Sequence, residues 1–583
     1  MRSPSPRVGA AGSSRRRLHF DAADLLLFAA PLLALFPLRN NDLWWHLATG
    51  RWILAEGGVP HRDPFSFTGF MGAWVDNEWL SQVALYGTWL AFGNAGLVLL
   101  RASVVACLFL LIRQLLVSAR RSEMLVPAVI CGISLSYGWW GTRPSMFSLV
   151  GTLVLLLILE RLRRSSRFAL ALPALFLVWA NTHPGFFFGL AVLLATLAGL
   201  LVEPLLPGWP RWSRQSGVYK QLAFGTLLSI AATLVNPYGW RVYAQQLVIA
   251  RNTEYRSLLD EWAPPSACFV LFVLVASAAF VALRFRKLPL ASLAPILGAA
   301  ALSTTAVRFE EYFALVAIPA MLAGLGPVRR CRLSALLVVL LLAASLALGL
   351  SPPMATVLQE GSGLSHAAVD PADVRLHARM QRNVALLAAL VAASLALAGA
   401  RRHGRAEWLL DRWRGRSVSL AAGSGLLFAV PLLLAATGAG ALPRDLVEPE
   451  RYPDRCAQRL PGPEEHVLNR LSWGGWLIWT AGTKTYIDGR SWGQPIFFEY
   501  HGCDGPGCAP VLARRDIDWV IVGPTDPPVR HLSGDPAWET VCQDDAAVLY
   551  HRLRTPSRDT PSSGPPGAPL SVASRERLRL SDR

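Results

Sequence analysis

Apolar stretches recur from residue 22 to residue 440, and short segments containing charged residues separate them. A helix needs about 20 apolar residues to cross the hydrocarbon core of a bilayer. Some stretches here are shorter, but they fit a regular alternation, so we predict thirteen membrane-spanning helices. The predicted spans are residues 22–38, 96–117, 124–140, 145–160, 168–182, 186–203, 220–236, 266–284, 288–306, 311–326, 333–350, 383–400 and 417–440.

Basic residues occur in every second connection between these spans. Residues 1–21 contain Arg15 to Arg17, and the same spacing recurs in segments such as 161–167 and 284–287. The positive-inside rule then places the N-terminus and these segments in the cytoplasm. The composition, rich in Ala, Arg and Leu, is typical of a high-GC bacterial genome. We therefore predict a multi-pass protein of the bacterial cytoplasmic (inner) membrane.

Composition supports this membrane interpretation. The 583 residues are 53% hydrophobic and 16% charged, and a soluble chain of this length needs more charged surface. The net charge of +17 would suggest nucleic acid in a soluble protein. Here the loops between spans account for the charge, and the chain has no nucleic-acid-binding motif, so we exclude nucleic acid as a partner.

The composition changes after residue 440. Short β-rich runs appear at Thr485–Asp488, Trp519–Val522 and Ala546–Tyr550, with glycine turn signals between them. Residues 441–554 are thus predicted to form a small α/β domain, which the parity of the spans places outside the cell. Residues 555–583 are rich in Pro, Ser and Arg, and we expect a disordered tail.

Four cysteines lie in this outer domain: Cys456, Cys503, Cys508 and Cys542. An oxidising compartment permits disulfides. Cys503 and Cys508 flank a short Gly/Pro turn and can close a small loop, which we favour over a metal site that would include His501.

Unusual polar residues gather at the predicted outer ends of the spans. The first outer loop, residues 39–95, is long. Its polar segments and those of the later outer ends are Asn40 to His46, His61 to Pro64, Trp74 to Trp79, Arg143-Pro144, Asn181 to Pro184, Asn236 to Tyr238, Asp260 to Trp262, and Arg308 to Glu311. Ionisable groups beside apolar spans are costly and are often functional. Their recurrence at one face predicts a site there.

Residues 42–56 are predicted to form an amphipathic interfacial helix, capped by Asn40 or Asn41. Asp42 and His46 are four residues apart and so share a face. The tryptophans in this segment suit the headgroup zone. One interpretation makes Asp42 an acid that complements the helix dipole, and the other makes it a catalytic group.

Arg143, His183 and Arg308 are candidates to bind a phosphate at the membrane surface, because a guanidinium forks onto phosphate oxygens and stays charged. The alternative is that they reach lipid headgroups, or that Arg308 pairs with Glu310.

Several of these segments resemble bacterial membrane proteins of the GT-C glycosyltransferase superfamily. The resemblance spans nearly the whole chain. It rests on Asn41 to Gly50, Trp179 to His183, Asn236 to Gly239, Gly474 to Leu477 and Tyr486 to Arg490.

The resemblance implies a bundle of many helices, a long first outer loop and a C-terminal outer domain. It also implies a catalytic acid just after the first span, which corresponds to Asp42. A second acidic motif corresponds to Asp76 or Glu78. We find no sequon-reading motif of the oligosaccharyltransferase kind.

The resulting hypothesis is a transferase that takes a sugar from a polyprenyl-phosphate donor. Arg143, Arg308 and His183 would hold the phosphate, with His46 and Glu261 as further substrate-binding residues. Asp42 would act as general base. Glu78 or Asp76 would orient the acceptor or hold a divalent metal, Mg²⁺ or Mn²⁺. The acceptor would be a glycan, lipid or protein, and membrane lipids would surround the site.

Two other classes of function are compatible with the sequence. A transporter or flippase would place its ionisable residues at mid-membrane, whereas most of those here lie at span ends. A non-catalytic scaffold or sensor would use the outer domain as its binding module and would not need Asp42.

Overall fold

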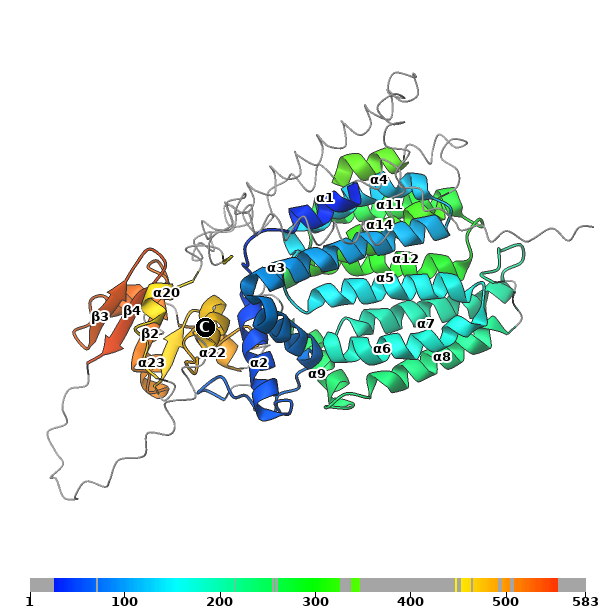
Figure 1. Cartoon of the computed structure of the whole chain (residues 1–583). Helices are drawn as coiled ribbons and strands as arrows, with labels where there is room; N and C mark the ends of the chain where they lie inside the picture. Colours follow the sequence, from blue (N-terminus) through cyan, green and yellow to red (C-terminus); the bar gives the residue numbers. More distant parts are fainter. Residues whose placement is uncertain are drawn as a thin grey trace, which may run out of the picture.

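A helical bundle and a small α/β domain make up the part of the chain that the computed structural model describes (Figure 1). The described residues are 26–69, 72–213, 215, 217–253, 256, 260–325, 337–345, 446–447, 452–462, 465–490, 495–503 and 508–553. Helix α2 (Asp42–Glu56) lies between the bundle and the domain.

Most helices of the bundle correspond to predicted spans, but α3 begins well before its span and α9 lies in a segment predicted to connect two spans. Their bounds are α1 Leu26–Leu33, α3 Trp79–Ser118, α4 Leu125–Ser136, α5 Ser145–Leu162, α6 Ala171–Thr182, α7 Phe186–Val202, α8 Val218–Thr233, α9 Arg241–Arg251, α11 Ala267–Arg284, α12 Leu290–Ser303, α13 Glu310–Tyr312 and α14 Ile318–Gly324. A π-helical stretch, Phe313–Ala317, joins the last two. Short 3₁₀ helices flank the others at Ser122–Met124, Tyr137–Trp139, Ser166–Leu170, Glu203–Leu205, Asp260–Trp262 and Val307–Phe309.

Four of the described helices are long and apolar enough to cross a membrane. They are Trp79–Ser118, Ser145–Leu162, the helical stretch Phe186–Leu205, and Ala267–Arg284. These helices support an integral membrane protein. The predicted number of thirteen spans is not confirmed. The predicted spans 383–400 and 417–440 lie outside the described residues, as do residues 1–21 and the predicted tail 555–583.

The segment predicted as the first outer loop is largely helical. It contains α2 and the first turns of α3, up to Gly93, whose backbone φ of 58° interrupts the helix. Only a residue without Cβ adopts this conformation readily. The break separates the N-terminal part of α3, which packs on α2, from the apolar part that follows.

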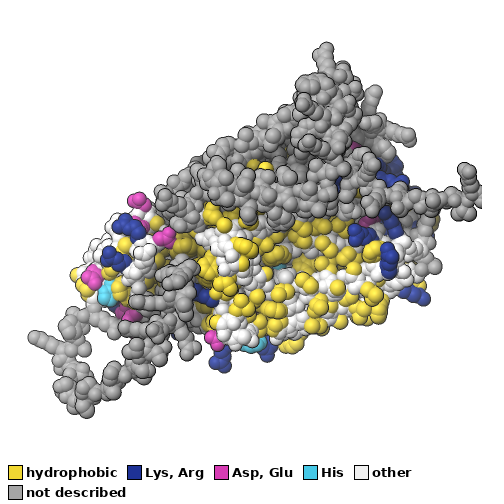
Figure 2. Space-filling model, in the orientation of Figure 1, with side chains coloured by type: hydrophobic (Ala, Val, Ile, Leu, Met, Phe, Trp, Pro, Cys, Tyr) yellow, Lys and Arg dark blue, Asp and Glu magenta, His cyan; other side chains and the backbone are white. Residues whose placement is uncertain are grey.

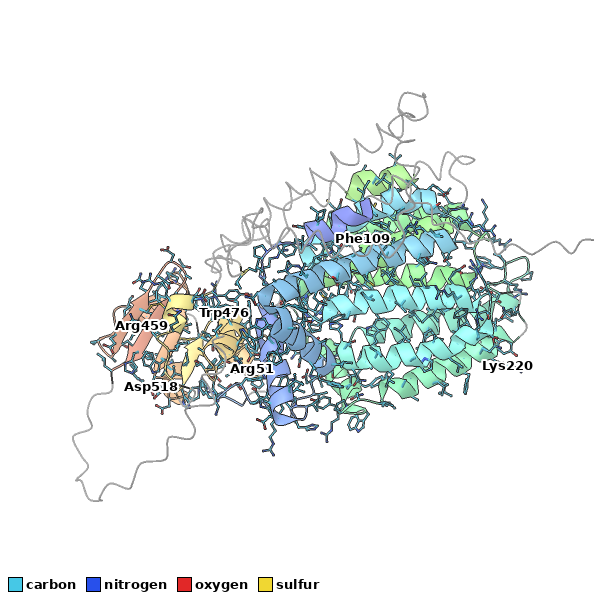
Figure 3. The ribbon with its side chains drawn as sticks, in the orientation of Figure 1. Arg51, Phe109, Lys220, Arg459, Trp476 and Asp518 are labelled. Atoms are coloured by element: carbon cyan, nitrogen blue, oxygen red, sulfur yellow. A yellow bond between two sulfur atoms is a disulfide. The ribbon has the colours of Figure 1, made fainter. Side chains whose placement is uncertain are left out.

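Basic side chains gather at the end of the bundle that lies away from the α/β domain, and apolar side chains cover the surface between (Figure 2). Contacts join the predicted inner segments at this end. Arg164 Nη2 donates to Ser118 O at 2.9 Å, and Arg121 Nε donates to Leu325 O at 2.6 Å. Lys220 lies at the same end (Figure 3). The segments predicted to share the cytoplasmic face are therefore together in space.

The C-terminal domain is built on a four-stranded sheet of order β1-β2-β4-β3, with β1 parallel to β2 and the other pairs antiparallel. The strands are β1 Val467–Asn469, β2 Trp519–Val522, β3 Trp538–Gln543 and β4 Val548–Arg552. The helices are α20 Asp454–Ala457, α21 Gly474–Thr480, α22 Pro495–His501, α23 Cys508–Arg514 and α24 Pro527–Leu532, with a 3₁₀ turn at Leu471–Trp473.

Two of the three predicted strands correspond to β2 and β4, but the strand predicted at Thr485–Asp488 is wrong. Its only ladder contacts are isolated bridges at Thr485. The segment makes short backbone contacts with Val467 and with residues 65–67. The Asn469 side chain adds two hydrogen bonds: its Oδ1 accepts the Tyr486 N–H at 2.9 Å, and its Nδ2 donates to Ile487 O at 2.8 Å.

Helix α2 joins the bundle to the C-terminal domain through aromatic side chains. Trp44 packs edge-on against Trp476, with ring centroids 4.5 Å apart, and Trp476 stacks on Tyr452 at the same separation. Trp476 lies at this junction in Figure 3. The predicted helix 42–56 is present, but the predicted headgroup placement of Trp44 and Trp45 is wrong, because they are only 1% and 3% exposed. They contact protein where sequence reasoning expected lipid.

The four cysteines of the C-terminal domain form two disulfides in the structure, Cys456–Cys542 and Cys503–Cys508. This agrees with the favoured interpretation of Cys503 and Cys508. The two bridges differ greatly in sequence separation, 86 residues against 5.

Removing the long-range bridge should destabilise the C-terminal domain more than removing the short one. Closing a longer loop constrains the unfolded chain more, and a native bridge typically contributes about 2–4 kcal/mol. We expect Cys456→Ala/Cys542→Ala to lower the thermal melting temperature by more than Cys503→Ala/Cys508→Ala, measured without reductant. An equal or larger effect of the short-bridge variant would contradict this expectation.

Candidate active site

A cavity of about 1020 Å³ lies where the ends of the bundle helices meet α2 and the C-terminal domain. Seven of the eight residues that the sequence singled out line it, namely Asp42, His46, Glu78, Arg143, His183, Glu261 and Arg308. Asp76, the eighth, does not. Residues far apart in the sequence thus meet around one space.

Asp42 is the first residue of α2, and both its backbone N–H and its side chain form hydrogen bonds. The Asn40 side chain accepts the N–H groups of Asp42 and Leu43, at 2.9 and 3.2 Å, which caps the helix. The Trp45 indole N–H donates to Asp42 Oδ1 at 3.3 Å. Desolvation raises the pKa of Asp42 against the opposing charge of Arg143. The helix-terminus and catalytic interpretations of this acid are therefore compatible.

Glu78 lies between two histidines at the start of α3. Its carboxylate oxygens are 3.7 Å from His46 Nδ1 and 3.5 Å from His183 Nε2. Desolvation raises the pKa of Glu78 well above its usual range, and the negative charges of Asp76 and Asp42 add to this. Burial and these neighbouring charges therefore favour the protonated form of Glu78.

Both histidines are neutral in this environment. Burial lowers the pKa of His46 and of His183 well below the usual range, and the neighbouring arginines act in the same direction. His183 Nδ1 accepts the Gly185 N–H at 3.0 Å, which places the ring proton on Nε2, toward Glu78. His183 can therefore donate a hydrogen bond, but it does not add the positive charge that a phosphate attracts most strongly.

Asp76 lies behind Glu78 and is 3% exposed. Its Oδ1 accepts the Gln82 side-chain amide at 2.8 Å and the Glu78 N–H at 3.2 Å. Gln82 also lies 3.4 Å from His46 Nδ1. Burial raises the pKa of Asp76 to about 7. Asp76 does not line the cavity, so we expect it to support the cavity wall through these hydrogen bonds.

Arg143 and Arg308 share the carboxylate of Glu261. Arg308 Nη1 is 2.9 Å from Oε1, and Arg143 Nη1 is 3.5 Å from Oε2. Burial acts to raise the pKa of Glu261, but the two guanidiniums outweigh it and hold the pKa below its usual range. Among the described residues, the ion-pair partner of Arg308 is Glu261 and not Glu310. Glu311 also lines the cavity and interacts with both arginines, so the two guanidiniums face two carboxyl groups.

The described residues offer no ready metal site in the cavity. Only Cys456, Cys542 and Asp544 bring three ligand-type side chains together with ligand atoms within 4.8 Å of one another. Those two cysteines are joined in a disulfide, so they do not act as thiolate ligands. The divalent metal remains a prediction.

The C-terminal domain supplies part of the cavity wall, and sequence reasoning gave a role at the site only to its segment around Tyr486 to Arg490. Arg470, Leu471, Ser472, Gly475, Gly489 and Tyr500 line this side. Arg470 is paired with Asp526, 3.6 Å away. Two sequence patterns could have indicated this wall, Gly474-Gly475 and Asp488-Gly489-Arg490. Their glycines permit close approach of the backbone to a neighbouring group.

No protein-family model and no curated protein matches this chain. Solved structures of an oligosaccharyltransferase and of ArnT are similar to it. ArnT from Cupriavidus metallidurans, bound to undecaprenyl phosphate, aligns over 93% of this chain and 98% of its own, with 16% identity and a TM-score of 0.48. The Archaeoglobus fulgidus oligosaccharyltransferase, tethered with an acceptor peptide, aligns over 86% and 69%, with 11% identity and a TM-score of 0.45. These TM-scores are below 0.5, so the proposals below rest on residues of this chain.

Proposed function

We propose that this protein is a membrane glycosyltransferase that moves a sugar from a polyprenyl-phosphate donor to an acceptor at the extracytoplasmic face. One observation supports this most strongly: a single cavity places an ionisable carboxylate, Asp42, in the same space as two arginines that share one ion-pair partner, Glu261. Transfer of a sugar from a phosphate needs a base for the attacking hydroxyl and positive charge for the leaving phosphate.

In this mechanism Asp42 accepts the proton of the acceptor hydroxyl as that oxygen attacks the anomeric carbon. The bond from the anomeric carbon to the donor phosphate oxygen breaks, and its electron pair leaves with polyprenyl phosphate. Arg143 and Arg308 stabilise the negative charge that develops on the leaving phosphate. Attack opposite the phosphate inverts the anomeric centre.

The surroundings of the two cavity acids support a division of roles between them. Neighbouring titratable groups whose environments separate their pKa values commonly act as an acid and a base. Burial raises the pKa of both acids, but the largest neighbouring charge is that of Arg143 for Asp42, which favours the ionised form, and that of Asp76 for Glu78, which opposes it. Asp42 is therefore the better base. Glu78, protonated and flanked by neutral histidines, suits a hydrogen bond that orients the acceptor or the sugar.

The proposed topology places the N-terminus in the cytoplasm and the C-terminal domain outside. The Lys and Arg side chains at the far end of the bundle support it, and so do the two disulfides in the C-terminal domain, since disulfides persist in oxidising compartments. The cavity then opens at the outer leaflet, where a lipid-linked donor reaches it from the membrane.

The test is release of polyprenyl phosphate in lipid nanodiscs. Wild-type protein and Asp42→Asn receive a panel of polyprenyl-phosphate sugars, with and without Mg²⁺ or Mn²⁺. Release by wild type that the variant lacks would support the transferase. Equal release by both would remove Asp42 from the mechanism.

Absence of release from every donor would overturn the proposal in favour of the two other classes. A fluorescent-lipid flip assay in proteoliposomes would then test the transporter. Retention of labelled glycan or peptide by the detergent-solubilised protein would test the scaffold.

A further inference from the structure

The backbone of the C-terminal domain reaches the proposed catalytic acid at one point, Gly489. A Cβ placed on Gly489 would overlap Asp42 Oδ1 and would lie 3.1 Å from Trp45 Nε1. The φ of Gly489 is not in the left-handed region, so backbone conformation does not require glycine there. Close approach to the carboxylate does.

Two further glycines bring this segment against α2. A Cβ on Gly475 would lie 3.0 Å from Asn41 O and 3.1 Å from Trp45 N, and one on Gly474 would overlap Ile487 O. Helix α21 therefore packs tightly between the start of α2 and the segment that leads into Gly489.

A buried ion network fixes the two residues on either side of Gly489. Arg490 donates through Nε and Nη2 to the Asp488 carboxylate, at 2.8 and 2.6 Å, and through Nη1 to Asp63 Oδ1 at 2.7 Å. The three side chains are at most 1% exposed. The guanidinium also faces the rings of Phe65 and Trp74. The segment is thus clamped to the first outer loop as well as to its own domain.

We propose that Asp488, Gly489 and Arg490 position Asp42 and set the charge around it, so that the C-terminal domain is part of the catalytic apparatus. They act through Asp42 and are positioning residues. This inference rests on the proposed function, in which Asp42 is the general base.

Charged groups from every neighbouring element face Asp42. Arg143 comes from the connection before α5, Glu261 from the connection before α11, Glu78 from the start of α3 and Asp488 from the C-terminal domain. Glu261 and Asp488 act to raise the pKa of Asp42, and Arg143 acts to lower it. The neutral His46 does not contribute a charge.

The network of two carboxylates and one guanidinium carries one net negative charge, and two single variants change it in opposite directions. Asp488→Asn makes the network neutral, and we expect the acid limb of the pH–rate profile to move to lower pH. Arg490→Gln makes it doubly negative, and the limb should move to higher pH. Each shift should be about 1 pH unit. Arg490→Lys keeps the charge and should restore the wild-type limb.

Asp42 protonation is also measured without turnover, from the infrared carboxylic-acid band of wild type after subtraction of the Asp42→Asn spectrum at each pH. Opposite shifts of this titration in Asp488→Asn and Arg490→Gln would support the inference. Shifts of the same sign, or none, would overturn it. Opposite shifts in a protein that transfers no sugar would leave the positioning intact and remove the proposed function.

Gly489→Ala supplies a test that does not depend on the buried ion network. The added methyl group displaces the Asp42 carboxylate, and a misplacement of about 1 Å costs about 10²-fold in rate. The loss should appear in kcat and not in the KM for donor, since the arginines are untouched. Gly534→Ala, whose Cβ would meet nothing within 4 Å, is the matched control. A kcat like that of the control would overturn the close-approach argument.

Discussion

Asp42→Asn should lower the rate of sugar transfer by about 10²–10⁴-fold, the usual contribution of a positioned general base. The amide has almost the same shape as the carboxylate and can still accept the Trp45 indole hydrogen bond. It cannot take the proton of the acceptor hydroxyl. The measurement is the initial rate of polyprenyl phosphate release at saturating donor.

The pH dependence adds a signature to this loss. In wild type the rate should fall as pH falls through the pKa of Asp42, which desolvation holds above its usual range. The residual rate of Asp42→Asn should be flat over the same interval. A parallel fall in both proteins would assign the acid limb to another group.

Stability separates a lost base from a damaged fold. A carboxyl whose folded pKa is raised binds more protons in the folded state, so it costs stability as pH rises from its unfolded value through its folded value. Above that pH the amide avoids this cost, and Asp42→Asn should melt no lower than wild type at neutral pH. Asp545→Asn, an exposed acid of the C-terminal domain, is the matched control and should retain full activity. A lowered melting temperature in Asp42→Asn alone would assign the loss to folding.

The helices of the bundle were predictable because hydrocarbon thickness limits the length of an apolar run. The span predicted at 266–284 is Ala267–Arg284 in the structure, and that at 186–203 is Phe186–Val202. Such runs carry their own signal and need no tertiary partner. Where a distant segment decides the environment, the same reasoning fails.

Trp44 shows this failure. A tryptophan near a span end usually indicates the headgroup zone, but Trp44 packs on Trp476, which is more than 400 residues away in the sequence. Strand β3 was not predicted, for a different reason. It is an edge strand whose residues are largely exposed or half-buried, so the apolar alternation that marks a strand is weak.

The membership of the cavity was largely predictable and its pairings were not. Recurrence of ionisable residues at one end of the spans indicated which groups would meet. Glu261 as the shared partner of Arg143 and Arg308 depends on how α4, α5, α11 and α12 pack, and no spacing in the sequence encodes it. Gly489 belonged to a segment that carried the resemblance, but its close approach to Asp42 depends on how the C-terminal domain packs on α2.

Arg308→Ala should lower the transfer rate by about 10²–10³-fold, the loss typical of removing one donor aimed at a developing negative charge. The KM for donor should rise as well, because the guanidinium also binds the phosphate before reaction. Arg308→Lys should recover only part of the rate, since an ammonium is a point charge without the planar fork. Arg241→Ala, which removes an exposed arginine of α9 that does not line the cavity, should leave kcat and KM unchanged.

A second variant separates phosphate binding from a structural ion pair. If Arg308 only neutralises Glu261, then Arg308→Ala harms the protein by leaving that carboxylate short of a partner, and Glu261→Gln in the same chain should restore the rate. If Arg308 binds the donor phosphate, the double variant stays as slow as Arg308→Ala, because removing the carboxylate returns no guanidinium to the site. We expect the second result, since Arg143 still lies beside Glu261 in the single variant. Recovery in the double variant would contradict the assigned role of Arg308 and leave Arg143 as the proposed phosphate ligand.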